Sequence, residues 1–143
     1  MSAINWRRIG LLNWFFFCWL LVASFYASAE DLHLGLIEYE IACLPCHGMN
    51  AHGDGPLAAA LEALPSDLTR ISLSNGGSFP ETRVLEFIDG RKQVAAHGPR
   101  QMPVWGERYR LKHVLDEDPN VIEKRARGRI EALVKYLISI QKK

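Results

Sequence analysis

The chain has 143 residues, of which 48% are apolar and 23% charged, and its formal net charge is +1. This length suits one domain, and this composition excludes a disordered chain. A charge so close to zero predicts neither nucleic-acid binding nor attraction to anionic lipid. Of the three cysteines, Cys18 lies in an apolar leader, so only Cys43 and Cys46 can act together, and a disulfide framework is excluded.

The first 29 residues have the pattern of an export signal. Arg7 and Arg8 form a basic start, residues 11–26 are nearly all apolar, and residues 27–29 (Ala-Ser-Ala) are the small residues that signal peptidase recognises. We expect cleavage to leave residues 30–143 as a single domain in the periplasm. The alternative is an uncleaved membrane anchor, since the apolar stretch approaches the length of a span. The basic end favours the cytoplasmic side, so the remaining chain is exported in either case.

After the leader, apolar residues recur at helical rather than strand-like spacing, which predicts an all-α domain. Leu34, Ile37 and Ile41 mark a first helix of about three turns. A short helix rich in Ala and Leu is predicted over residues 56–64. Pro65 is expected to end it, because proline lacks an amide donor and disfavours helix in the residue before it.

A third helix is predicted over residues 78–89. Ser78 and Glu81 have the spacing of a capping box, and Gly90 follows as a closing residue.

The last helix has the clearest pattern. Its apolar residues follow the i, i+3, i+4, i+7, i+8 spacing of one helical face: Ile130, Leu133, Val134, Leu137 and Ile138. Two starts are possible: Asp118 before Pro119, or Asn120 paired with Glu123.

Residues 43–47, Cys-Leu-Pro-Cys-His, form the most specific motif in the chain. Thiols at Cys43 and Cys46 face the same side of a helix end, so both can reach the two vinyl groups on one haem edge. His47 follows directly, and its neutral imidazole can bind the iron. The motif therefore predicts one covalently bound haem c. A zinc site or a redox CxxC is the weaker alternative, because no second cysteine pair exists and no strand precedes the motif.

The second axial ligand of the iron is expected to be Met102. The other methionine after the leader, Met49, follows His47 too closely in sequence to reach the opposite haem face. Met102 lies in a loop over residues 98–106 and is flanked by proline, unlike a methionine of a core stripe. A core-filling role is the plain alternative. A bis-histidine haem is the chemical rival, for which three histidines are candidates: His52, His97 and His113.

Taken together, these segments resemble class I c-type cytochromes of the bacterial monohaem kind, from Gly35 to the last helix. The resemblance rests on three groups of residues: Gly35-x3-Tyr39-x3-Cys43-x2-Cys46-His47-Gly48, the loops at 53–56 and 65–69, and Met102-Pro103-x-Trp105-Gly106. It implies a cytochrome c fold, in which three to five helices wrap one covalently bound haem and the first helix crosses the last. It also implies that His47 and Met102 are the two axial ligands.

The helix before the motif is expected to pack against another helix. Gly35, Tyr39 and Cys43 are spaced by four and form one stripe that leads to the haem site. Because Gly35 has no side chain, another helix can approach closely there, and Tyr136 is the expected aromatic partner.

Two further roles follow from the resemblance. The carbonyl of Pro56 is expected to accept the second ring N–H of His47. Trp105 is expected to lie against the haem edge or a propionate, with a plain core aromatic as the equal alternative.

Basic residues around Met102 are expected either to steer acidic partners or to form a solvated loop: Arg91, Lys92, Arg100, Arg108, Arg110 and Lys112.

An iron with two strong protein ligands has no open site for a substrate, so we expect an electron carrier and not an enzyme in its own right. Its expected partners are redox proteins of a respiratory chain, without nucleic acid, and with membrane contact only through an uncleaved leader or a membrane complex. One alternative is a haem c relay subunit of a larger oxidoreductase. A haem-based ligand sensor is a third, and it requires Met102 to dissociate.

Overall fold

The computed structural model of the protein describes residues 29–90, 102–111 and 118–142. Contacts divide the chain into two compact units, Met1–Asp31 and Leu32–Lys143. The predicted signal peptide lies outside the described residues except for its last residue, so its cleavage or retention stays a prediction. Within the described ranges, no helix combines the length and the apolarity needed to cross a membrane.

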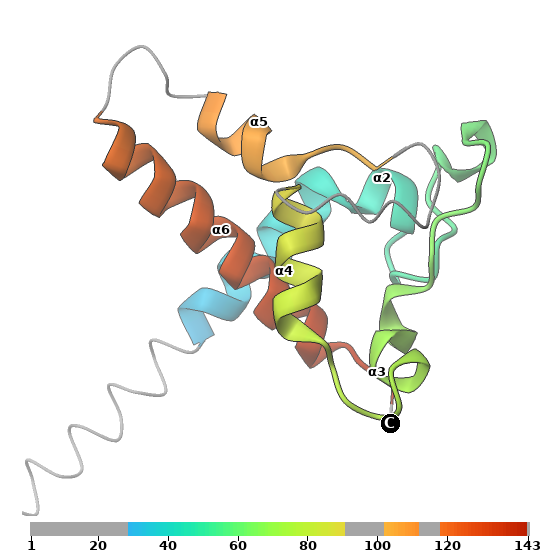
Figure 1. The fold of residues 1–143 in the computed structure, drawn as a ribbon. Coiled ribbons are helices and arrows are strands. Elements are labelled where there is room, and N and C mark those ends of the chain that lie inside the picture. The colour runs from blue at the N-terminus through green and yellow to red at the C-terminus, as the bar shows by residue number, and fades with distance from the viewer. Residues whose placement is uncertain (1–28, 91–101, 112–117, 143) are drawn as a thin grey trace, which may run out of the picture. The chain divides into compact units, whose positions relative to one another are not determined.

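All regular structure in the described residues is helical, and no strand occurs among them (Figure 1). The first helix covers residues 29–42. The elements that follow it are α2 (Leu44–His47), the 3-10 turns η1 (Ala58–Ala60) and η2 (Leu68–Arg70), α3 (Ile71–Ser74), α4 (Glu81–Asp89), α5 (Trp105–Leu111) and α6 (Pro119–Ser139). The prediction of an all-α class is confirmed for this part of the chain.

The first helix packs closely against α6 at Gly35. A Cβ atom built on Gly35 would collide with the carbonyl group of Ala132 and lie 2.8 Å from the Cβ of Tyr136. One turn further along, the rings of Tyr39 and Tyr136 are 5.3 Å apart at 45°. The expected close approach at Gly35, with Tyr136 as the aromatic partner, is confirmed.

The aliphatic residues that marked the first helix do not face the core. Leu34 and Ile37 are exposed, and Ile41 is 65% exposed, whereas Tyr39 and Ala42 are buried. The helix buries its glycine and tyrosine face instead, because only the absence of a side chain at Gly35 allows α6 to come this close.

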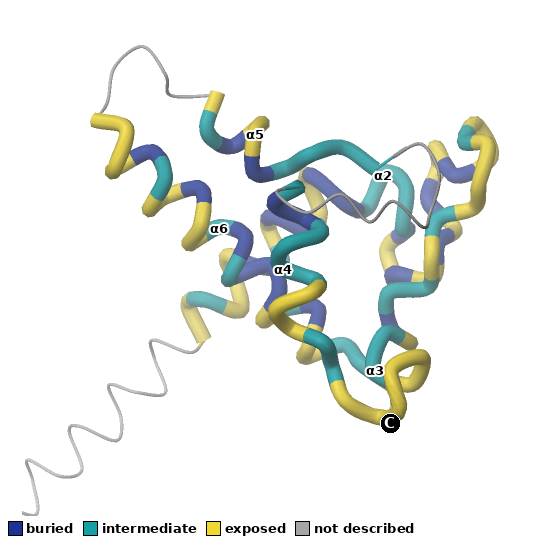
Figure 2. The backbone as a smooth tube through the Cα atoms, viewed as in Figure 1, coloured by how far each residue is buried: buried dark blue, intermediate teal, exposed yellow. Residues whose placement is uncertain are grey.

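The apolar face of α6 forms the centre of the core, as the sequence predicted. Buried and exposed stretches alternate along this helix (Figure 2). Four of its five predicted core residues are buried and only Ile138 is exposed: Ile130, Leu133, Val134 and Leu137. Asp118 caps the helix, since its carboxylate accepts a hydrogen bond from the amide of Asn120 at 2.7 Å, and Pro119 occupies the first turn. The first of the two predicted starts is therefore correct.

The predicted helix over residues 56–64 is wrong. Only the single turn η1 forms there, and Leu57 and Leu64 are both exposed. A short helix needs tertiary packing of an apolar face, and this segment buries only Ala58 of its turn. The amide of Leu57 is bonded instead to the carbonyl of Pro45 at 2.8 Å.

The helix predicted over residues 78–89 forms, but it begins at Glu81. The capping box does not form, because Pro80 is the N-cap and no side chain bonds there. Gly90 ends the helix in the left-handed conformation, with φ 80° and ψ 5°, as expected. After it, α5 begins at Trp105, where the sequence predicted that a loop would continue through Gly106.

Candidate functional site

The Cys-His motif lies where the first helix ends. Cys43 is the N-cap of α2 with φ −111° and ψ −40°, so it keeps a right-handed helical conformation. Its carbonyl accepts hydrogen bonds from the amides of Cys46 at 3.1 Å and His47 at 2.8 Å. The two cysteines are thus about one helical turn apart, on the same side of the chain. Neither forms a disulfide.

The environment of Cys43 does not suit a redox dithiol. Burial, followed by the charges of Glu38 and Cys46, raises the pKa of this thiol to about 12. A reactive cysteine of a disulfide oxidoreductase needs the opposite, a pKa lowered by positive surroundings. The thiol of Cys43 is therefore neutral and unreactive towards disulfides at neutral pH, which argues against the redox alternative.

His47 has the form that a metal ligand needs. Its Nδ1 lies 3.0 Å from the carbonyl oxygen of Ser66. A carbonyl can only accept, so Nδ1 carries the proton and the lone pair is on Nε2. No described residue forms a hydrogen bond with Nε2. Burial lowers the pKa of His47, against the smaller opposite effect of the Ser66 carbonyl, and this keeps the ring neutral.

The expected partner of His47 was the carbonyl of Pro56, and the structure gives Ser66 instead. Pro56 is exposed, and its two neighbours bond to the motif backbone: Gly55 to the carbonyl of Cys46 at 3.1 Å, and Leu57 to that of Pro45 at 2.8 Å. The backbone of residues 55–57 therefore forms hydrogen bonds with the backbone of α2 and none with the His47 imidazole. The loop at 65–69 carried the family resemblance, but the sequence did not reveal that its carbonyl would reach His47.

Tyr39 connects the first helix to the residue directly after His47. Its hydroxyl donates a hydrogen bond to the carbonyl of Gly48 at 2.5 Å, and the side chain is almost fully buried. Burial, followed by the charges of Cys43 and Tyr136, raises the pKa of the phenol, so it stays protonated and keeps donating. Tyr39 thus fixes the end of the motif against the helix that carries it.

Met102 and Trp105 are both partly buried and pack against the core cluster that contains Cys43. The Trp105 ring lies 6.2 Å from that of Tyr109, and the Arg108 guanidinium is 5.1 Å from the Trp105 ring centre. The plain core role of Trp105 thus has support, while its contact with a haem edge or propionate stays a prediction.

A buried ion pair that the sequence did not reveal joins the first helix to α6. Arg129 donates to both carboxylate oxygens of Glu38, at 2.6 and 2.9 Å, and Glu38 is only 3% exposed. The same guanidinium lies 4.2 Å from the centre of the Tyr109 ring. The sequence offered one signal for this pair. Glu38 directly precedes Tyr39 and lies three residues after Gly35, on the side of the first helix where Gly35 lets another helix approach.

The candidates for a bis-histidine haem are only partly described. His52 is exposed, and its Nε2 lies 3.3 Å from the ammonium group of Lys142. His97 and His113 lie outside the described residues. Among the described residues, no cluster of three or more His, Cys, Asp or Glu side chains could hold a metal ion by itself.

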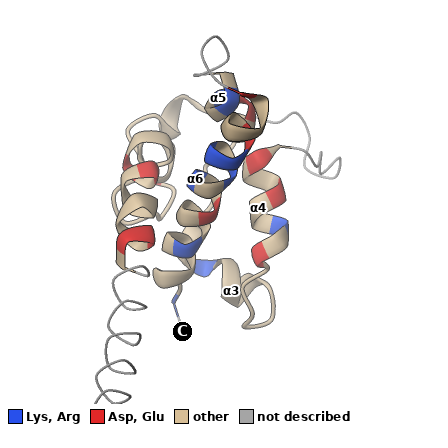
Figure 3. Ribbon diagram, turned by 90° about the vertical axis from the view of Figure 1, so that its left-hand side faces the viewer, with Lys and Arg blue, Asp and Glu red and all other residues tan. Residues whose placement is uncertain are grey.

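Of the basic residues expected around Met102, Arg110 is paired with two carboxylates. This guanidinium bonds to Asp89 at 3.0 Å and Glu123 at 3.3 Å, so it does not project freely from the surface. Arg108 lies over Trp105, and the other four members lie outside the described ranges. The charged residues of α4 are mostly acidic, whereas those of α6 are mostly basic (Figure 3).

The residues present fit a covalently attached haem. The motif offers two cysteine thiols outside any disulfide and one neutral imidazole whose Nε2 has no partner among the described residues. Apolar side chains that are only partly buried pack against the same core and could line a planar apolar group: Leu44, Leu68, Phe79, Val84, Leu85, Met102 and Trp105. This combination suits a cofactor that is apolar, metal-containing and thiol-linked.

Comparisons with protein-family models, with curated proteins and with solved structures found no match. The resemblance to class I cytochromes therefore stays a prediction, carried by the motifs of the chain itself.

Proposed function

We propose that the protein is a periplasmic electron carrier that holds one haem c through Cys43 and Cys46, with His47 and Met102 as the axial ligands of the iron. The observation that carries the proposal is the arrangement and protonation of the side chains in residues 43–47. Two thiols outside any disulfide lie one helical turn apart, next to a neutral imidazole whose Nδ1 is held by Ser66. A redox dithiol would not need the histidine and would need a lower pKa at Cys43.

When bound, haem c supplies an iron that alternates between the ferric and ferrous states by one electron. The residues of the chain hold this centre in place. The Ser66 carbonyl fixes the tautomer and orientation of His47 and makes Nε2 more basic. Met102 would bind the iron together with His47, and the two ligands would leave no position on it for a substrate. A centre closed in this way exchanges electrons with other redox proteins and does not catalyse a reaction by itself.

The test uses the full chain, exported from a host that matures c-type cytochromes. We expect a reduced pyridine spectrum typical of thioether-linked haem, colour that resists extraction by acidified acetone, and a far-red sulfur-to-iron band in the oxidised protein. Colourless protein, or haem that acidified acetone removes, would overturn the proposal.

Met102 is tested separately by Met102→Ala, which should abolish the far-red band and leave the pyridine spectrum unchanged. Met49→Ala is the matched control, because Met49 is 80% exposed and should leave both signals unchanged. A far-red band that persists in Met102→Ala would show that Met102 is not the ligand. Loss of the band in Met49→Ala would also show that Met102 is not the ligand.

The carrier role is tested by voltammetry and by exposure to carbon monoxide. We expect a reversible one-electron couple and no binding of carbon monoxide by the reduced protein at neutral pH. Binding of carbon monoxide would favour the ligand sensor. Stable copurification with other subunits would favour the relay subunit of a larger oxidoreductase over a free carrier.

A further inference from the structure

The segments on either side of residues 91–101, which are the end of α4 and the start of α5, contact each other. A Cβ built on Gly90, directly after α4, would collide with the side chain of Val104. A Cβ built on Gly106, in the first turn of α5, would collide with the Asp89 carboxylate and lie 2.6 Å from the Asp89 carbonyl. The end of α4 and the start of α5 are therefore in close contact, and Met102 is two residues before Val104.

An ion pair crosses this contact. The Asp89 side chain is 9% exposed, and its Oδ1 accepts a hydrogen bond from Nη1 of Arg110 at 3.0 Å. The same nitrogen lies 3.3 Å from Oε2 of Glu123 on α6. Arg110 thus connects α4, α5 and α6 at one point, beside the segment that carries Met102.

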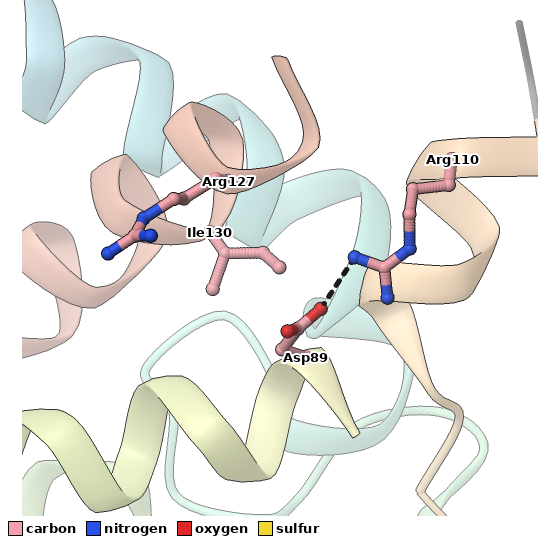
Figure 4. Close-up of a pocket in the computed structure, with 4 residues that line it drawn as sticks. All are labelled: Asp89, Arg110, Arg127 and Ile130. Carbon is pink, nitrogen blue, oxygen red and sulfur yellow. Dashed lines mark hydrogen bonds and ion pairs between the residues drawn. The ribbon is translucent and has the colours of Figure 1, made fainter. Parts of the chain in front are cut away.

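Asp89 and Arg110 also line a small cavity with Arg127 and Ile130. In Figure 4 the guanidinium of Arg110 points at the Asp89 carboxylate, whereas the Arg127 side chain points away from it. Arg127 pairs instead with Glu131, one turn along α6, at 2.8 Å. Two arginines therefore line one cavity, and only Arg110 is bonded across the α4–α5 contact.

We propose that Asp89 and Arg110 are positioning residues for Met102, and this inference rests on the proposed function. The Val104 side chain packs against Gly90 and the Gly106 backbone against Asp89, and the ion pair holds the two segments together. A thioether binds iron less tightly than an imidazole does, so its bond to iron depends on how well the chain presents the sulfur. Removing either charge breaks the ion pair between α4 and α5 at a largely buried site, which loosens the contact next to Met102.

The test compares Asp89→Asn and Arg110→Gln with the wild-type haem protein. Two readouts report on Met102: the far-red band of the oxidised protein, and the affinity of that protein for added imidazole, which competes with Met102 for the iron. Both variants should weaken the band and increase the affinity for imidazole by about tenfold or more, with an unchanged pyridine spectrum. Arg127→Gln, which removes the same charge from the same cavity, should match the wild type.

A general loss of stability is distinguished by Gly35→Ala, which disturbs the contact of the first helix with Ala132 and Tyr136 of α6. It should lower the unfolding midpoint without changing the affinity for imidazole. Should Asp89→Asn fail to fold, Arg110→Lys and Glu123→Gln provide milder changes to the same cluster, with a smaller increase in affinity expected. Wild-type imidazole affinity in the folded Asp89 and Arg110 variants, or an equal increase in Gly35→Ala, would overturn the inference. A wild-type protein without haem would instead overturn the proposed function.

Discussion

The segment from Cys43 to Gly48 and the segment from Met102 to Gly106 are held in different ways. In the first, the amides of Cys43 and His47 bond to carbonyls four residues earlier, and Tyr39 bonds to Gly48 nine residues later. In the second, Val104 and Gly106 pack against Gly90 and Asp89, and the ion pair beside them joins residues 21 positions apart.

This difference has a chemical consequence. Helical geometry within a few residues presents the two thiols and His47 together, so under the proposed function haem attachment would depend on local structure. Presentation of Met102 depends on how three helices pack. Variants of the helix packing should therefore alter stability or the Met102 ligation and leave the covalent attachment unchanged.

The largest expected effect is that of Glu38→Gln. The change leaves Arg129 without its carboxylate partner at a site where the ion pair is mostly buried, and should lower the free energy of unfolding by about 3 kcal/mol. Urea unfolding followed by circular dichroism measures it. Glu131→Gln is the control, since the exposed pair with Arg127 should contribute about 0.5 kcal/mol or less. Equal effects of the two changes would show that the buried pair has no special importance.

Gly35→Ala should lower the free energy of unfolding by about 2 kcal/mol, because the new methyl group meets the Ala132 backbone, which cannot move away freely. Gly128→Ala in α6 is the matched control. No atom lies within 4 Å of its added Cβ, so this change should stabilise the protein by about 0.5–1 kcal/mol. The same urea titration measures both, and a stable Gly35→Ala protein would contradict the close helix contact.

The smallest effect is expected for Tyr39→Phe, which removes the hydroxyl and leaves the buried carbonyl of Gly48 without this donor. The loss should be about 1 kcal/mol. The far-red band should persist, because Tyr39 lies on the cysteine-histidine side. Its disappearance would mean that the two segments are not independent.

What the sequence predicted correctly is mostly local. The Asp118 cap and the apolar face of α6 depend on spacings within one helix, and both are present. Leu34, Ile37 and Ile41 correctly marked the first helix, but they are exposed, because its buried face is set by the approach of α6 at Gly35.

The errors and omissions concern distant partners. The acceptor of the His47 N–H is Ser66, 19 residues away, rather than Pro56. Glu38 and Arg129 are 91 residues apart, and Asp89 and Arg110 are 21 apart, so no local pattern marks either pair. A charged residue in a helix looks the same in sequence whether it faces water or a distant partner.

The most direct test of the account is peptide mapping of residues 43–47 by mass spectrometry, on protein exported from a maturation-competent host. We predict that the peptide carries the mass of one haem, and that neither Cys43 nor Cys46 reacts with an alkylating reagent after denaturation and reduction. Recovery of both cysteines as alkylated thiols, without haem on the peptide, would contradict the account.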